Sequence, residues 1–97
     1  MHARVVRAML KKGKGDAAIE TYRQSILADA QKQEGFKGAT LLTDKGKGRL
    51  ISVTVWATEA DMRESETSGY LGEQLARIGP AFTGETSVEH YEVSFHV

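Results

Sequence analysis

The segment spanning residues 35–62, GFKGATLLTDKGKGRLISVTVWATEADM, constrains the fold most, because it predicts two strands, their turn and a helix start. Small and apolar residues alternate after Gly35, and residues 44–48 read DKGKG, a composition typical of turns. Residues 50–57 are rich in β-branched side chains, which favour a strand. Thr58 is positioned to cap the helix that follows, with Asp61 in its first turn. The predicted order is strand, turn, strand and helix.

The flanking sequence completes a β-α-β-β-α-β order. Residues 2–10 predict a first strand, residues 16–33 a helix and residues 88–97 a closing strand. The helix carries one apolar stripe with spacings of three or four residues, formed by Ile19, Tyr22, Ile26 and Ala30. This stripe requires a sheet to cover it. The sequence therefore predicts an α+β, ferredoxin-like protein: a single domain over residues 1–97 with a four-stranded antiparallel sheet.

The second helical region, residues 60–78, contains Gly69 and Gly72. Because glycine weakens a helix, we expect two short pieces, broken at these glycines. The second piece is predicted to pack inward through Leu71, Leu75 and Ile78. A helix broken in this way would form a movable wall over a pocket.

Composition excludes several functional classes. Lys plus Arg and Asp plus Glu number 13 each among 97 residues, so we expect no nucleic-acid partner. No apolar run is long enough to span a bilayer and no signal peptide follows Met1, so we expect a cytoplasmic protein without a membrane partner. The chain contains no cysteine, which excludes disulfides and cysteine-ligated metals.

Both faces of the predicted sheet carry apolar side chains. In the strand at 50–57, one face presents Ile51, Val53 and Val55, and the other presents Leu50, Ser52, Thr54 and Trp56. The helices of this fold can cover only one face. We therefore predict that the remaining apolar face packs on the same face of a second copy, in a two-fold homodimer.

This order and these residues resemble the antibiotic biosynthesis monooxygenase family of the dimeric α+β-barrel superfamily. The resemblance covers nearly the whole chain and rests on Gly35-Phe36, Val55-Trp56, the helix start at 58–62 and the final strand at 91–93. It implies a dimeric α+β barrel. Some members of the family oxygenate polyketide-derived phenols without a cofactor and others degrade haem, so the resemblance leaves the reaction open.

The functional residues of that family are only partly present. In its quinone-forming oxygenases, a strand Asn and a helix Tyr correspond here to Ser52 and Met62, and the strand Trp is retained as Trp56. Serine can still donate a hydrogen bond, but methionine cannot replace a phenolic proton donor. Leu75 stands approximately where the haem-degrading branch has its histidine ligand, so a haem site of that kind is not implied.

We take Trp56, Ser52, Thr54, Tyr22 and His90 as candidate substrate-binding residues of a pocket between the sheet and the helices. Trp56 could stack on a planar ligand, although a purely structural core role is the commoner one. His90, with Glu92 nearby, is an acid-base candidate if it faces the pocket. No two histidines lie at ligand spacing within one element, so we expect no metal and no cofactor.

Two functional hypotheses remain. The first is a cofactor-independent monooxygenase of the antibiotic biosynthesis type, acting on a small aromatic or polyketide-like substrate. The second is a non-catalytic homodimer of the same fold that binds a small hydrophobic or aromatic ligand or acts as a stress-related module. The resemblance of the whole chain favours the first, and the loss of two of the three oxygenase positions favours the second.

Overall fold

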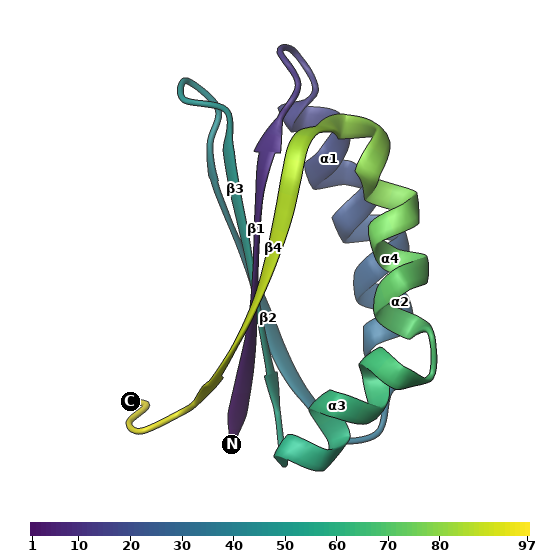
Figure 1. Cartoon of the computed structure of the whole chain (residues 1–97), viewed down its shortest axis with the longest axis vertical. Coiled ribbons are helices and arrows are strands. Elements are labelled where there is room, and N and C mark those ends of the chain that lie inside the picture. Colours follow the sequence, from purple (N-terminus) through teal and green to yellow (C-terminus); the bar gives the residue numbers. More distant parts are fainter.

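A four-stranded antiparallel sheet forms one layer of the molecule (Figure 1). The structure is a computed structural model that describes all of residues 1–97. The strand order across the sheet is β2-β3-β1-β4, so β3 and β1 are the central strands. The strands are β1 (His2–Leu10), β2 (Phe36–Asp44), β3 (Arg49–Trp56) and β4 (Phe82–Glu92). This arrangement confirms the predicted ferredoxin-like α+β fold.

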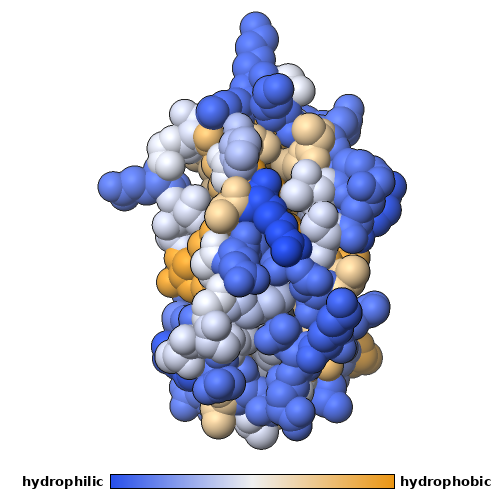
Figure 2. Space-filling view, turned by 90° about the vertical axis from the view of Figure 1, so that its right-hand side faces the viewer, coloured by the Kyte–Doolittle hydropathy of each residue, from blue (hydrophilic) through white to orange (hydrophobic).

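All helices lie on one face of the sheet (Figure 1). In the first crossover, a π-helical segment, Tyr22–Ile26, joins two short α-helices into one continuous helical run. Figure 2 looks onto the helical layer, whose outer surface is mostly hydrophilic. No helix has the length and apolar character needed to cross a membrane. The helices are α1 (Gly15–Thr21), α2 (Leu27–Ala30), α3 (Glu59–Thr67) and α4 (Tyr70–Ile78), followed by a 3₁₀ turn, Gly79–Ala81.

The core lies between the sheet and the helices and forms two clusters. The larger cluster consists of Ala8, Leu10, Ala18, Tyr22, Ile26, Leu50, Ile78 and Ala81. The smaller cluster consists of Ala30, Trp56, Met62 and Tyr70. The predicted helical stripe is therefore confirmed at three of its four positions. At its N-terminal end Ala18 is buried instead of Ile19, because Ala18 lies four residues, about one turn, before Tyr22.

β4 begins six residues earlier than the sequence predicts, and it ends at Glu92. Gly84 has φ 71°, and the register of β4 against β1 shifts near this point, so a bulge interrupts the alternation that marks a strand. At the other end, the pairing with β1 stops at Glu92. Apolar and polar residues alternate over residues 93–97 as in a strand, but this segment does not continue the pairing with β1.

Of the two breaks predicted in the second helical region, only Gly69 interrupts the helix. Gly69 lies between α3 and α4 with φ 93°, a left-handed conformation that glycine adopts without strain. Gly72 lies inside α4, so the break predicted there is wrong. The packing of α4 on the sheet outweighs the weak helix propensity of one glycine. Thr58 caps α3 as predicted, because its Oγ1 accepts the backbone N–H of Asp61 at 3.0 Å.

Alanine at these two glycines is expected to change stability in opposite directions. Gly69→Ala should lower the free energy of unfolding by about 1 kcal/mol, because a side chain is strained in the left-handed region. Gly72→Ala should raise it by about 0.5 to 1 kcal/mol, because alanine favours a helix interior. A Cβ meets nothing within 4 Å at either position, so packing does not obscure the comparison. Urea denaturation measures both changes, and shifts in the same direction would contradict the backbone assignment.

The sheet face opposite the helices is uncovered in the single chain (Figure 1). On β3, the side chains of Ile51, Val53 and Val55 point to this face, and they are half-buried. In register with them, Leu42 of β2 and Tyr91 of β4 are about half exposed, at 51% and 48%. Arg7 of β1 and Glu89 of β4 form an exposed ion pair on the same face, so its apolar character is interrupted there. The homodimer that would cover this face stays a prediction.

Candidate functional site

A small cavity lies between the helix-facing side of the sheet and the helical layer. Its volume is about 50 Å³, and most of its wall is hydrophobic. The sheet, the first crossover and α4 each supply part of the wall. The polar and charged side chains in this wall are Arg4, Tyr22, Ser52, Thr54, Tyr70 and Gln74. An apolar cavity with a few convergent polar groups is the usual form of a small-molecule site.

Two buried hydroxyl groups meet in the cavity wall. The Tyr22 hydroxyl and Ser52 Oγ are 2.9 Å apart and share a hydrogen bond. Tyr22 begins the π-helical segment, a geometry that often occurs at functional sites. Burial raises the pKa of Tyr22, so its hydroxyl stays protonated at neutral pH. The sequence singled out both residues, and the structure brings them together as a neutral pair that can donate a hydrogen bond to a ligand.

Trp56 lies in the core beside the cavity and does not form part of its wall. Its side chain is fully buried and meets Phe36 edge to face, with ring centres 5.6 Å apart. Its Nε1 donates a hydrogen bond to Thr54 Oγ1 at 3.0 Å, and Thr54 does line the cavity. The wall position expected for Trp56 is therefore not observed, because the end of β3 packs against Met62 in the smaller core cluster. Trp56 is therefore connected to the cavity only indirectly, by its hydrogen bond to Thr54.

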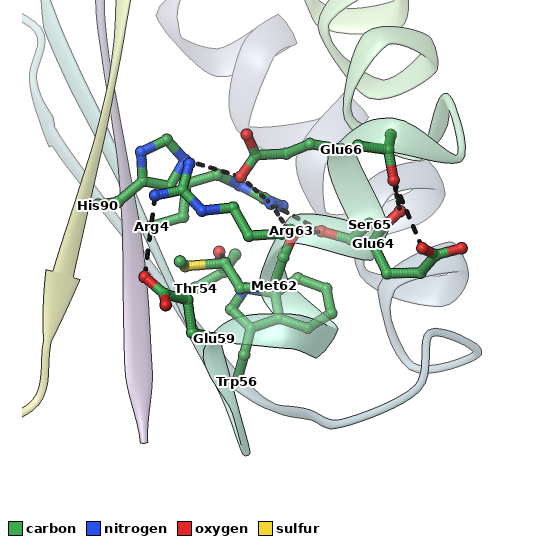
Figure 3. A network of polar contacts seen from close by, with 11 residues as sticks. Arg4, Thr54, Trp56, Glu59, Met62, Arg63, Glu64, Ser65, Glu66 and His90 are labelled. Atoms are coloured by element: carbon green, nitrogen blue, oxygen red, sulfur yellow. Dashed lines mark hydrogen bonds and ion pairs between the residues drawn. The ribbon is translucent and has the colours of Figure 1, made fainter.

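Arg4 places a charged side chain in the interior, with only 2% of its surface exposed. Its Nη1 donates hydrogen bonds to the Met62 carbonyl at 3.3 Å, Ser65 Oγ at 2.7 Å and the Glu66 carboxylate at 3.2 Å (Figure 3). The guanidinium carbon lies 5.1 Å from the centre of the Trp56 ring, within cation–π range. Burial lowers the pKa of Arg4 and the Glu66 carboxylate opposes this, but a guanidinium remains charged. Arg4 therefore supplies a positive charge to the cavity wall.

His90 points toward the helices but lies outside the cavity wall. Its Nε2 is 2.7 Å from Glu66 Oε2, the oxygen that also accepts a hydrogen bond from Arg4 (Figure 3). The carboxylate partner of His90 is thus Glu66 of α3, and not Glu92 as expected from the sequence, because α3 packs over this end of the sheet. His90 connects to the cavity only through the Glu66 and Arg4 side chains.

Three polar residues of the wall were missed by reasoning from the sequence: Arg4, Tyr70 and Gln74. A signal was present for each. Arg4 and Val6 lie two residues apart, so both point to the face of β1 that becomes buried. Tyr70, Gln74 and Ile78 recur every four residues and form the buried stripe of α4. Leu71 and Leu75, expected to point inward, are half-buried and do line the cavity. Burial raises the pKa of Tyr70 to about 12, so it too is a neutral donor.

The site contains no arrangement for holding a metal ion. No group of three or more His, Cys, Asp or Glu side chains is placed to ligate one. His2 pairs with Glu92 across the sheet, and residues 93–97, which include His96, continue beyond it. Leu75 presents an apolar side chain to the cavity, so the wall offers no imidazole to a haem iron. The chemistry available to these residues is hydrogen bonding and stabilisation of negative charge.

Comparison with known proteins identifies the fold and the family. The chain is similar to the solved structure of SnoaB, a cofactor-independent oxygenase from Streptomyces nogalater, with TM-score 0.76, 15% identity, and 99% and 95% of the two chains covered. It is also similar to the heme-degrader MhuD from Mycobacterium tuberculosis, with TM-score 0.80, 22% identity, and 100% and 99% covered. NE2512 from Nitrosomonas europaea, a protein of unknown function, gives TM-score 0.78, 22% identity, and 99% and 91% covered.

Comparison with curated proteins gives no match. The solved structures, all below 25% identity, establish the fold alone. The family follows from a different comparison, because the model of the family described as antibiotic biosynthesis monooxygenase matches residues 1–82. This match includes β1, both crossovers, the central hairpin and all of the residues that line the cavity. The chain therefore belongs to the antibiotic biosynthesis monooxygenase family.

Proposed function

We propose that this protein is a cofactor-independent monooxygenase that acts on a small, planar aromatic or polyketide-like substrate in the cavity between the sheet and α4. The observation that carries the proposal is the combination of an apolar cavity with the paired hydroxyls of Tyr22 and Ser52 and the buried charge of Arg4. The family membership and the likeness of the fold to that of a cofactor-independent oxygenase support it.

The cavity wall favours a substrate that is itself acidic. Its titratable side chains are Arg4, Tyr22 and Tyr70. Burial raises the pKa of both tyrosines, so none of the three accepts a proton at neutral pH. A phenol or its keto tautomer can lose a proton to water, and Arg4 and the hydroxyls would then stabilise the anion. The anion passes electrons to O₂. A methylene group between two aromatic rings then becomes a ketone: one atom of O₂ becomes the carbonyl oxygen, and the other leaves as water.

A substrate of this size requires α4 to move. The cavity volume is about 50 Å³, whereas a cavity that binds benzene measures about 150 Å³. α4 supplies Tyr70, Leu71, Gln74, Leu75 and Ile78 to the wall, and it is joined to α3 at Gly69. We propose that α4 swings outward about Gly69 to admit the substrate and then closes to exclude water.

Oxygen uptake with anthrone tests the proposed function. Wild-type protein should consume O₂ and form anthraquinone, and Tyr22→Phe should reduce the rate by about tenfold or more, because a donor to the developing anion is lost. Tyr91→Phe removes a hydroxyl outside the cavity and should leave the rate unchanged. The pH dependence should follow the pKa of the substrate, so two anthrones of different acidity should give different inflections. The same inflection for both would instead indicate a base on the protein.

The second candidate is a non-catalytic member of the family that binds a small hydrophobic ligand. One observation favours it: Met62, which corresponds to the phenolic proton donor of the quinone-forming oxygenases, is fully buried in the core and carries no acidic proton. Saturable binding of planar aromatic compounds without oxygen uptake would support this candidate and contradict the first.

A further inference from the structure

Gln74 carries a buried acceptor that no group of the protein satisfies. The side chain is on α4 and is 4% exposed, and it forms part of the cavity wall. Its Oε1 has no hydrogen-bond partner, and it is the one buried side-chain nitrogen or oxygen in the chain of which this is true. An unsatisfied buried acceptor is destabilising, so its retention requires an explanation.

The orientation of the Gln74 amide is fixed by its neighbour. Its Nε2 donates a hydrogen bond to Asp29 Oδ2 at 3.3 Å. Asp29 is held ionised, because the hydrogen bond from Arg77 is the main cause that lowers the pKa of this carboxylate. An ionised carboxylate can only accept, so the amide must turn its NH₂ group toward Asp29. The carbonyl oxygen therefore faces away from Asp29, and it is itself buried.

No donor of the wall lies within hydrogen-bond distance of this oxygen. The two wall hydroxyls of Tyr22 and Ser52 are bonded to each other, and Thr54 accepts from Trp56. The three hydrogen bonds that Arg4 donates to the protein all leave from Nη1 and end on residues of α3. The oxygen has almost no accessible surface in the closed cavity. A ligand group that donates to it would therefore reach it when α4 opens as proposed above.

We propose that the cavity selects planar aromatic ligands that carry a hydroxyl or N–H donor for Gln74 Oε1, in addition to the acidic oxygen required by the proposed function. This inference rests on that function for the location of the ligand and extends it to the substrate class. Gln74 then acts as a specificity-determining residue. A ligand lacking the second donor would leave the acceptor unpaired, and this is the most effective way in which a site rejects an analogue.

Isothermal titration calorimetry under nitrogen, with 1-naphthol and the series of dihydroxynaphthalenes, tests the inference separately from any oxygenation. In wild-type protein, at least one diol should bind more tightly than 1-naphthol. Gln74→Leu should reduce this preference about three- to tenfold, the value of one hydrogen bond. Gln74→Met, which is unbranched like glutamine, is a second variant in case leucine disturbs the packing. Gln31→Leu, on the exposed end of the first crossover, is the matched control and should keep the preference.

The readout is a ratio of two affinities, so a general loss of stability in a variant does not alter it. A preference for diols that both Gln74 variants retain would overturn the inference, and so would a wild-type protein that binds 1-naphthol as tightly as every diol. Absence of oxygen uptake from anthrone, by contrast, bears only on the proposed reaction. Retained diol selectivity without oxygen uptake would keep the inference and favour the non-catalytic candidate.

Discussion

Replacing Val53 by lysine is expected to convert the predicted homodimer into monomers. Val53 lies at the middle of β3, half-buried on the sheet face that no helix covers. In a two-fold dimer formed through this face, each subunit would bury the new ammonium group, and the two charges would repel. We expect the dissociation constant to rise by about a hundredfold or more, which corresponds to about 3 kcal/mol of assembly free energy.

Sedimentation equilibrium at micromolar concentration measures this change. Gln31→Lys adds the same charge at an exposed position on the helical side and should leave the association constant unchanged. If Val53→Lys and Gln31→Lys associate equally well, the uncovered face is not the interface. A wild-type protein that stays monomeric at these concentrations would contradict the homodimer itself.

Removing the buried charge of Arg4 is expected to destabilise the fold strongly. Arg4→Met keeps an unbranched apolar stem but leaves Glu66, which is only 22% exposed, with His90 as its one remaining side-chain partner. It also removes the contact with the Trp56 ring and the hydrogen bond to Ser65. Breaking a buried ion pair on one side typically costs about 3 to 5 kcal/mol, and we expect a loss of about 3 kcal/mol here.

Urea denaturation of Arg4→Met, Glu66→Gln and the double variant tests the reason for this loss. The double variant should recover part of the stability, because the uncompensated carboxylate is then gone. Arg23→Met removes an arginine from an exposed i, i+3 pair with Glu20 and should change stability little. If Arg4→Met changes stability as little as Arg23→Met does, the expected loss is contradicted. Packing of the methionine side chain would then compensate for the lost ion pair with Glu66.

Local sequence patterns were sufficient to predict the elements that depend on neighbouring residues. The hairpin turn at 44–48, the Thr58 cap, the break at Gly69 and the two faces of β3 each follow from neighbouring residues, and each is observed. Local patterns gave the wrong strand bounds where pairing with another strand decides them. β4 is defined by its register against β1, so its bulge at Gly84 and its end at Glu92 were not predicted.

The buried charged and amide groups of the site follow only from the tertiary structure, because the cavity wall brings together residues that lie far apart in the chain. The sequence identified Tyr22, Ser52 and Thr54 as neighbours of a pocket, and their spacing on one helix and one strand was enough for that. The burial of Arg4 and the free oxygen of Gln74 depend on partners 62 and 45 residues away, Glu66 and Asp29. A charged or amide side chain is normally exposed, and only a long-range partner stabilises it in the interior, so no local pattern reveals such a residue.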